Sequence, residues 1–272
     1  NIMAGIMMPY MSSIGQQGYV APSTIPSLSL WYNGSASSTT VNNVTTNNFN
    51  AVVTNGSTVQ SWIDLQNIGG PSNYYNGGGG NAPTYAIPIQ NGLGSVLYAS
   101  ASKQNLDINP VGSWLKNQTG LTVYVVARPT SLPATIFPLV VADTRLGIWW
   151  NGTNYSVGSS ATSYGTVTVT NDTTKFHMYG MIFDGSQSTA STKLKFRYDK
   201  AAKTLTYTGS GDTGTGSPGA VFFGGDARGS GTFSQTFMNG YIGEVLIWTR
   251  ALNSTEIGSV ELYINTKWGL GL

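Results

Sequence analysis

Short runs of apolar residues recur along most of the chain, and turn residues separate them. Runs of this kind include SLSLWYN, GSVLYAS, LTVYVVARP, IFPLVVAD, RLGIWWN, GTVTVTN, KFHMYGMIFDG, AVFFGGD and GYIGEVLIWTR. Alternation with a period of two is typical of half-buried strands, and a continuous apolar run suits a strand buried on both faces. Many short strands at this spacing predict an all-β sandwich or barrel.

The segment TKLKFRYDKAAKTLTYTG, residues 192–209, has the clearest hairpin pattern. Apolar residues alternate with polar ones on both sides of DKAAK, which predicts two paired strands with a lysine-rich face in water.

One helix is predicted near the C-terminus. Asn253 can cap it, and Glu256 stands three positions on, where its side chain can reach back to the cap. Ile257, Ile264 and Trp268 fall on one helical face together with Val260, and Gly269 ends the helix.

The chain divides into an N-terminal arm, residues 1–26, and one domain, residues 27–272. APSTIPS, residues 21–27, is typical of a linker, and no later linker interrupts the strand pattern. Four of the seven Met residues lie in NIMAGIMMPYM. Such a start suits either an end that is disordered or docked locally, or an adhesive arm that binds other structural proteins of one assembly. We expect the second.

Composition narrows the function classes. Charged residues make up 9% of the chain, against roughly 25% in ordinary soluble domains. A net charge of +2 is too small to predict the basic surface that nucleic-acid binding requires. Without Cys there is no disulfide or thiolate metal site, and the only histidine, His177, fits a satisfied strand residue better than a catalytic base. No apolar run reaches the ~18 residues of a membrane span.

The charges are also unevenly placed. Asp64 is the only residue before Lys103 with a side chain that is charged at neutral pH. An isolated surface usually depends on interspersed charge for solubility, so this part of the chain is expected to meet other protein or to be covered by polar amides.

Several segments together resemble the concanavalin A-like lectin/glucanase superfamily. They are WIDLQN, APTY, NGLGSVLYASASKQNLDI, LTVYVVARPTS and MNGYIGEVLIWTRALNSTEIGSVELYINTKWGL. The resemblance covers about residues 27–270 and is greatest for the laminin-G-like jelly-roll modules of viral structural and bacterial surface proteins. It implies two antiparallel sheets packed face to face, with glycan binding common and catalysis confined to certain branches.

Glu244 is the candidate catalytic acid. Retaining sugar hydrolases need two carboxyl groups roughly 5 Å apart, and the glucanase branch of the superfamily supplies them from one strand as E-x-D-x-x-E. The strand here reads GEVLIWTR and holds no second acid before Glu256. We therefore interpret Glu244 as a structural acid, held by backbone groups or by Arg250, and expect no enzyme activity.

A second set of candidates is acidic and amide side chains, which could bind the structural calcium that jelly-roll lectins often carry: Asp107, Asn109, Asp143, Asn151, Asp184, Asp212 and Asp226. Calcium needs six to eight oxygens, and the chain lacks a contiguous calcium loop. Asp143 and Asp226, each following a strand, are the best metal candidates. The alternative is that these acids bond to turn backbones.

GIWWNGTNY, residues 147–155, is the candidate carbohydrate-binding segment. Adjacent Trp149 and Trp150 must point to opposite faces of a sheet. We expect one exposed ring, with Asn151, Asn154 and Tyr155 beside it to bind sugar hydroxyls. The alternative is that the second Trp is buried under a loop or against a partner.

The sequence favours a non-catalytic structural or adhesive module of a large extracellular assembly. A virion surface protein, such as a capsid decoration, fibre or minor capsid protein that binds a cell-surface glycan, suits the fold and the arm. A bacterial cell-surface adhesin and a polysaccharide-cleaving enzyme are the alternatives.

Overall fold

The computed structural model describes residues 21–34, 39–41, 44–46, 54–70, 72–73, 79–170, 172–227 and 233–272. Residues 1–20, which hold most of the predicted arm, lie outside the described residues.

The described strands form two large sheets, and every strand pairing within them is antiparallel. The eight-stranded sheet runs in the order β16 (Ala201–Lys203), β15 (Leu194–Tyr198), β14 (His177–Asp184), β9 (Gly120–Pro129), β21 (Gly240–Trp248), β7 (Leu93–Tyr98) and β6 (Thr84–Gln90), with β1 (Leu28–Asn33) also paired to β21.

The nine-stranded sheet runs in the order β17 (Thr206–Thr208), β13 (Tyr164–Val167), β12 (Tyr155–Gly158), β11 (Gly147–Trp150), β10 (Phe137–Ala142), β18 (Val221–Phe223), β8 (Leu106–Ile108), β5 (Ser72–Asn73) and β4 (Ser61–Trp62). Two small ribbons add β19 (Gly225–Asp226) with β20 (Thr236–Phe237), and β2 (Thr39–Val41) with β3 (Val44–Thr46). The helical elements are α1 (Ala190–Lys193), α2 (Ser254–Trp268) and the 3₁₀ turns η1 (Pro22–Thr24), η3 (Ser100–Ser102) and η4 (Ser113–Leu115).

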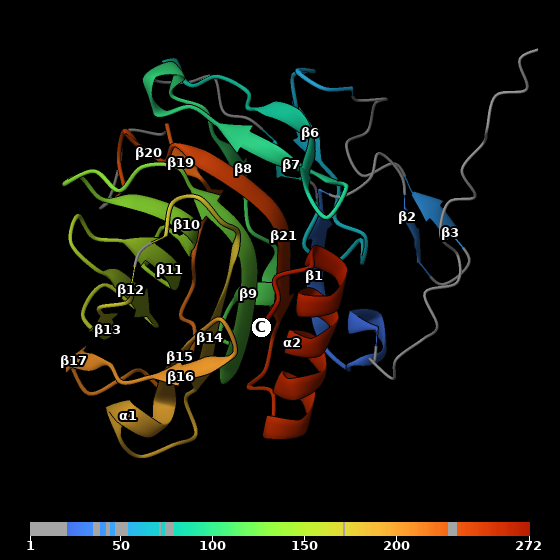
Figure 1. Ribbon diagram of the computed structural model, residues 1–272. Coiled ribbons are helices and arrows are strands. Elements are labelled where there is room, and N and C mark those ends of the chain that lie inside the picture. The colour runs from blue at the N-terminus through green and yellow to red at the C-terminus, as the bar shows by residue number, and fades with distance from the viewer. Residues whose placement is uncertain are drawn as a thin grey trace, which may run out of the picture.

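The two sheets pack face to face, as predicted, and α2 covers the outer face of the eight-stranded sheet (Figure 1). Strand β9 explains why one run is apolar throughout. Val123 and Val125 belong to the core between the sheets, whereas Tyr124 and Val126 belong to the cluster beneath α2. A strand covered on both faces needs apolar residues at every position.

The sequence signals at both ends of α2 are confirmed. Asn253 Oδ1 accepts hydrogen bonds from the backbone N–H groups of Thr255 and Glu256, and Glu256 Oε2 accepts one from Asn253 N–H. Gly269 follows with φ of 59°, a left-handed conformation that glycine adopts without steric cost. The buried face includes Val260, Ile264 and Trp268.

The predicted hairpin at residues 192–209 is shorter than expected. Asp199 and Lys200 have φ of 50° and 64° and form the turn between β15 and β16, so the DKAAK loop shrinks to two residues. The chain then leaves this sheet, and β17 joins β13 in the nine-stranded sheet. Alternation alone could not distinguish one hairpin from a strand that crosses between sheets.

The last residues of the predicted arm and linker contact the domain. Pro22 is buried, and Ile25 packs with Leu28 and Trp31 in the cluster beneath α2. The division into residues 1–26 and 27–272 stays a prediction, because most of residues 1–26 lie outside the described residues.

The described residues contain no helix with the length and apolar character of a membrane span.

Candidate functional site

Trp149 and Trp150 lie on opposite faces of β11, as the period of the strand requires, but both are buried. Trp150 lies in the core between the sheets, where it donates from Nε1 to the carbonyl of Pro133 at 2.8 Å. Trp149 lies on the outer face, packed against Phe233 and Tyr164. Only 3% and 4% of the two residues is exposed, so the expected exposed ring is wrong.

The polar residues beside the tryptophans are used by the turn itself. Asn151 Oδ1 accepts from the N–H groups of Thr153 and Asn154, and Asn154 Oδ1 accepts from the hydroxyl of Thr168. Tyr155 is buried, and its hydroxyl lies 3.1 Å from that of Tyr179. Burial raises the pKa of Tyr155 to about 12. The segment therefore lacks the exposed ring flanked by free amides that we expected as a sugar platform.

Asp143 and Asp226 do not form one metal site. Strands β10 and β18 are antiparallel, with Ala142 opposite Val221, so Asp143 lies beside the start of β18 and Asp226 lies beyond its end. Both oxygens of Asp143 lie 3.1 Å from Gly219 N, as in the turn-backbone alternative. Among the described residues, no group of three or more His, Asp and Glu side chains could hold a metal ion.

The other acidic and amide candidates are dispersed. Asp184 accepts hydrogen bonds from Ser186 and Gln187, which lower the pKa of its carboxyl, and Asp212 accepts one from Ser159. Asp107 is buried in β8, and Asn109 precedes a cis proline. His177 Nδ1 lies 2.7 Å from Asp199, and its Nε2 lies 3.0 Å from the carbonyl of Asp172. Both ring nitrogens of His177 thus have structural partners.

Glu244 is enclosed between β21 and α2, with 1% of the residue exposed. Ile242 and Val245 both face the core between the sheets although three positions separate them, because a β-bulge interrupts the strand between Ile242 and Glu244. A bulge adds one residue and reverses the alternation. It therefore turns Glu244 to the outer face, toward α2.

Four side chains donate hydrogen bonds to this carboxylate. Trp31 Nε1, Tyr263 Oη and Lys267 Nζ reach Oε1 at 2.7, 2.7 and 2.9 Å, and Trp268 Nε1 reaches Oε2 at 2.6 Å. The preceding Gly243 leaves room for Trp268, since a Cβ there would lie 2.3 Å from its ring. The predicted partner Arg250 was wrong, because Arg250 instead binds Glu256 at the start of α2.

Lys267 completes this buried group. Its ammonium also contacts Asn33 Oδ1 at 3.0 Å, which ties α2 to β1. Burial lowers the pKa of Lys267, although attraction to Glu244 acts in the opposite direction. The arrangement suits a clamp that joins β1, β21 and α2, because every oxygen of the carboxylate is occupied by the protein's own donors.

Asp64 is a second buried carboxylate that the fold itself uses. Its oxygens accept four backbone N–H groups, those of Trp31, Gln66, Ile68 and Gly69, at 2.7–3.0 Å. Burial raises the pKa of Asp64, and the four N–H donors oppose that rise. The carboxylate thereby fixes the loop after β4 against β1.

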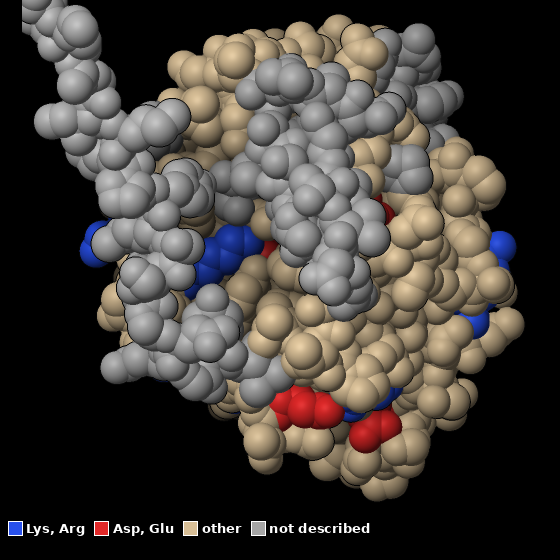
Figure 2. Space-filling view, turned by 90° about the vertical axis from the view of Figure 1, so that its right-hand side faces the viewer, with Lys and Arg blue, Asp and Glu red and all other residues tan. Residues whose placement is uncertain are grey.

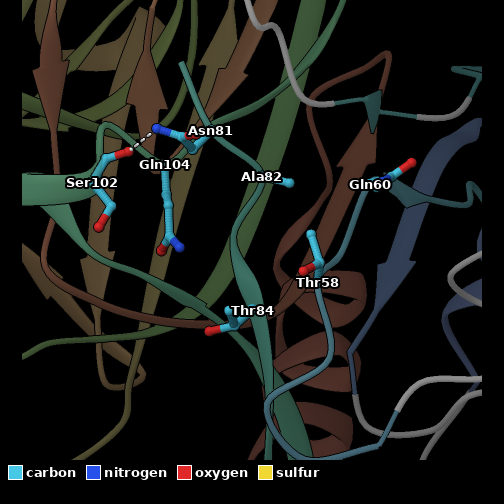
Figure 3. A pocket seen from close by; sticks show the side chains of 7 residues that line it. All are labelled: Thr58, Gln60, Asn81, Ala82, Thr84, Ser102 and Gln104. Atoms are coloured by element: carbon cyan, nitrogen blue, oxygen red, sulfur yellow. Dashed lines mark hydrogen bonds between the residues drawn. The ribbon is translucent and has the colours of Figure 1, made fainter. Parts of the chain in front are cut away.

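A polar groove, which we call the neutral groove, lies where three segments meet beside the start of β6. It has a volume of about 510 Å³ and is lined by Thr58, Gln60, Asn81, Ala82, Thr84, Ser102 and Gln104 (Figure 3). Isolated β-bridges join Thr58 to Thr84 and Asn81 to Gln104. The lining residues come from parts of the chain that sequence patterns do not connect, so sequence reasoning missed this site.

Two amides of the neutral groove are held in place by hydrogen bonds to backbone groups. Asn81 Nδ2 donates to the carbonyls of Ser102 and Gly79 at 2.7 and 3.4 Å, and Gln104 Oε1 accepts from Ala99 N–H at 2.7 Å. Within the described part of the chain, Gln60 and the hydroxyls of Thr58 and Thr84 have no hydrogen-bond partner. The groove thus offers both donors and acceptors to a ligand.

Lys103 is exposed and stands between the lining residues Ser102 and Gln104, so the neutral groove borders one positive charge although its own lining is uncharged. Asp64, the one side chain before Lys103 that is charged at neutral pH, is only 3% exposed. The described surface formed by residues 21–102 therefore carries no exposed charged side chain. On the side of the molecule that bears α2 and β1, most of the described surface likewise belongs to uncharged residues (Figure 2).

No protein-family model and no curated protein matches the sequence. Solved structures do match. Trypanosoma rangeli sialidase, in complex with a difluoro nononic acid, aligns with a TM-score of 0.55 and 16% identity over 88% of this chain and 33% of that chain. Domain 4 of AbnA, a GH43 extracellular arabinanase from Geobacillus stearothermophilus in complex with arabinotriose, aligns with a TM-score of 0.52 and 16% identity over 73% of this chain and 91% of that domain.

The binding domain of botulinum neurotoxin serotype D/C aligns with a TM-score of 0.52 and 8% identity over 88% of this chain and 52% of that one. The chain spans about a third of the length of the sialidase that it matches. The chain is an all-β sandwich. At these low sequence identities, the comparisons show that this chain and the solved structures have a similar fold, and they show no more than that.

Proposed function

We propose that this chain is a non-catalytic module that binds glycans, and that the neutral groove is its binding site. The observation that carries the proposal is the lining of the groove, which consists of amide and hydroxyl side chains with one alanine and no charged group. Sugar hydroxyls both donate and accept hydrogen bonds, and amides and hydroxyls match them in both roles. A volume of about 510 Å³ falls within the usual range of ligand sites.

Two observations support a binding role over catalysis. Glycoside hydrolysis needs a pair of carboxyl groups that flank the bond to be cut, and the described lining of the groove contains none. Glu244, the acid that sequence reasoning considered first, is buried and surrounded by donors from Trp31, Tyr263, Lys267 and Trp268. A carboxylate engaged in this way is poorly placed to reach a sugar.

The fold adds support of a general kind. The resemblance to concanavalin A-like jelly-roll modules suggests a lectin-like domain, and two similar sandwiches come from an arabinanase domain that binds arabinotriose and from a sialidase that binds a nononic acid derivative. We place the module in an extracellular assembly, a virion surface or a bacterial cell surface, where residues 1–26 contact other structural proteins. The uncharged surface around residues 21–102 suits such contacts.

A glycan array followed by calorimetry would test the proposal. We expect the protein to bind an oligosaccharide. Gln60→Ala and Thr84→Val should each weaken binding by roughly 2- to 12-fold, because each removes a hydrogen bond worth about 0.5–1.5 kcal/mol. Neither side chain bonds to another described residue, so the thermal midpoint should stay close to that of the wild type.

Gln187→Ala is the matched control, because Gln187 is an exposed amide on the turn after β14, bonded only to Asp184 among the described residues. It should leave binding unchanged. Binding of no glycan, or an equal loss with Gln187→Ala, would exclude the neutral groove as a glycan site. Release of reducing ends from a bound glycan would exclude the non-catalytic reading.

A further inference from the structure

Lys267, near the end of α2, places its side-chain nitrogen between two side chains on neighbouring strands. Nζ lies 3.0 Å from Oδ1 of Asn33 on β1 and 2.9 Å from Oε1 of Glu244 on β21. Asn33 and Glu244 are register partners in the antiparallel pairing of these strands, so their side chains project from the same face. An amine, an amide and a carboxylate from three distant segments therefore meet at one point.

The protein encloses this group of three side chains. Only 5% of Asn33, 1% of Glu244 and 16% of the Lys267 side chain is exposed. Aromatic rings cover the amine, since Nζ lies 5.4 Å from the ring centre of Tyr263 and 5.8 Å from that of Trp268. Burial in these surroundings excludes bulk water, which would otherwise compete for reaction with the amide.

Burial also favours the reactive form of the lysine. It lowers the pKa of Lys267, although attraction and hydrogen bonding to Glu244 act in the opposite direction. The neutral amine is the nucleophile, and desolvation is one of the ways in which proteins activate a lysine. Glu244 Oε1, at 2.9 Å, is within the distance at which a general base takes a proton.

We propose that this is a modification site, at which Lys267 forms an amide bond to the side chain of Asn33 and so cross-links α2 to β1, with Glu244 as the base. The reaction occurs once in each chain, so even slow attack on an amide goes to completion. The fold supplies the proximity, because it holds the reacting groups in contact. The proposal does not rest on glycan binding in the neutral groove.

The exchange balances without another reagent. Rotation of the Asn33 amide about its last torsion, which has a broad minimum, turns Cγ toward the amine. Lys267 Nζ gives one proton to Glu244 Oε1, and its lone pair forms a bond to Cγ. Nζ loses a second proton as the bond from Cγ to Nδ2 breaks, and Nδ2 leaves with the electron pair. Nδ2 takes up both protons, one of them from Glu244, and departs as ammonium, so Glu244 ends as a carboxylate.

The bond closes a loop that contains almost the whole domain, since 234 positions separate Asn33 from Lys267. A covalent link of this kind restricts the unfolded chain, as a disulfide does, and this chain has no Cys. A force that enters through β1 and leaves through α2 would pass through the new bond and bypass both sheets.

Intact-mass spectrometry of the denatured full chain would test the proposal. We expect a mass about 17 Da below that of the sequence, because the amine displaces one ammonia. Peptide mapping should recover one branched peptide that joins β1 to α2, and trypsin should not cleave after Lys267. The measurement uses the wild-type protein, so it does not depend on the folding of a variant.

Lys267→Arg should restore the full mass, because a guanidinium stays protonated and is no nucleophile. Lys193→Arg is the matched control: Lys193 is also buried, but its ammonium donates to the backbone carbonyl of Gly211 at 3.1 Å. It should keep the loss of mass. The comparison is needed because Asn33 precedes Gly34, and an Asn–Gly pair can also lose ammonia by forming a cyclic imide.

Two results would overturn the cross-link. A wild-type mass equal to that of the sequence would leave the ionic contact with Glu244 as the role of Lys267. A loss of ammonia that persists in Lys267→Arg, without a branched peptide in the wild type, would identify a cyclic imide instead. Glu244→Gln should also show the full mass, and a branched peptide in that variant would exclude Glu244 as the base.

Discussion

At the scale of single residues, Glu244 shows how a buried charge becomes part of a fold. Its carboxylate accepts four hydrogen bonds and pairs with a lysine that burial would otherwise disfavour as a cation. Sequence reasoning predicted a structural acid from the missing second carboxylate. It could not predict the partners, because Trp31 is 213 positions away and a bulge decides which face the side chain occupies.

We expect Glu244→Gln to lower the free energy of unfolding by about 3–5 kcal/mol, because it leaves the Lys267 charge buried without its partner. The substitution also replaces a carboxylate oxygen, which accepts hydrogen bonds, with an NH₂ group that faces the surrounding donors. Urea unfolding would measure this. Glu256→Gln is the matched control, since Glu256 pairs with Arg250 at a partly exposed position, and it should cost less than about 1 kcal/mol. Similar losses for both variants would contradict the clamp.

The paired tryptophans mark what a strand pattern can and cannot predict. Alternation correctly placed Trp149 and Trp150 on opposite faces of β11. The exposure of a face depends on what covers it, and Trp149 is covered by Phe233, which is far away in the sequence and belongs to no strand.

We expect both Trp149→Ala and Trp150→Ala to destabilise the protein by about 3–5 kcal/mol, the usual loss when a large aromatic side chain is removed from a core. Chemical unfolding of the two variants would check this. A variant that unfolds at the wild-type midpoint would show that its ring is not buried in solution.

At the scale of elements, α2 was the most predictable part of the chain. Its cap, its terminal glycine and its apolar face are all local signals, and each is confirmed. The hairpin at residues 192–209 was predicted less well, because the decision to cross from one sheet to the other after β16 depends on partners from elsewhere in the chain.

The start of α2 should make stability depend on pH. Hydrogen bonding from Arg250 lowers the pKa of Glu256 below its ordinary value of 4.5. A carboxyl with a lower pKa in the folded state stabilises the protein above the unfolded-state pKa, and this contribution is lost as the pH falls through the folded-state pKa.

The stability difference between wild type and Glu256→Gln should therefore be constant, at about 0.5–1 kcal/mol, near neutral pH and should shrink below about pH 4.5. Glutamine keeps an oxygen that can accept from Asn253 N–H, so the comparison isolates the charge. Urea unfolding of both proteins between pH 3 and pH 7 would measure it. A difference that grows on acidification would contradict the assignment.

At the scale of the whole molecule, the repeated strand pattern and turn spacing predicted a sandwich or a barrel. The two sheets packed face to face were implied by the resemblance to concanavalin A-like modules, and the structure has them. The sequence did not predict the neutral groove, which forms only when residues 58–60, 81–84 and 102–104 come together through two isolated β-bridges. Binding surfaces assembled from distant loops leave no periodic signal in the sequence.

The boundary between arm and domain can be decided by two truncations. Pro22 and Ile25 are buried against the domain, and Arg250 Nε donates to the carbonyl of Pro26 at 3.1 Å. Removal of residues 1–20 should therefore leave the unfolding free energy unchanged, whereas removal of residues 1–26 should lower it by about 2–3 kcal/mol through the exposed apolar surface beneath α2.

We propose that residues 1–26 contact other structural proteins of the assembly. Where these neighbours include further copies of this chain, both truncations should abolish self-association. Sedimentation velocity of the full chain and of both truncated proteins over a range of concentrations would measure this. Urea unfolding separates the two effects. Equal stability of both truncated proteins would mean that Ile25 contributes nothing to the core. Unfolding on removal of residues 1–20 alone would mean that the domain begins earlier in the chain than the strand pattern predicts.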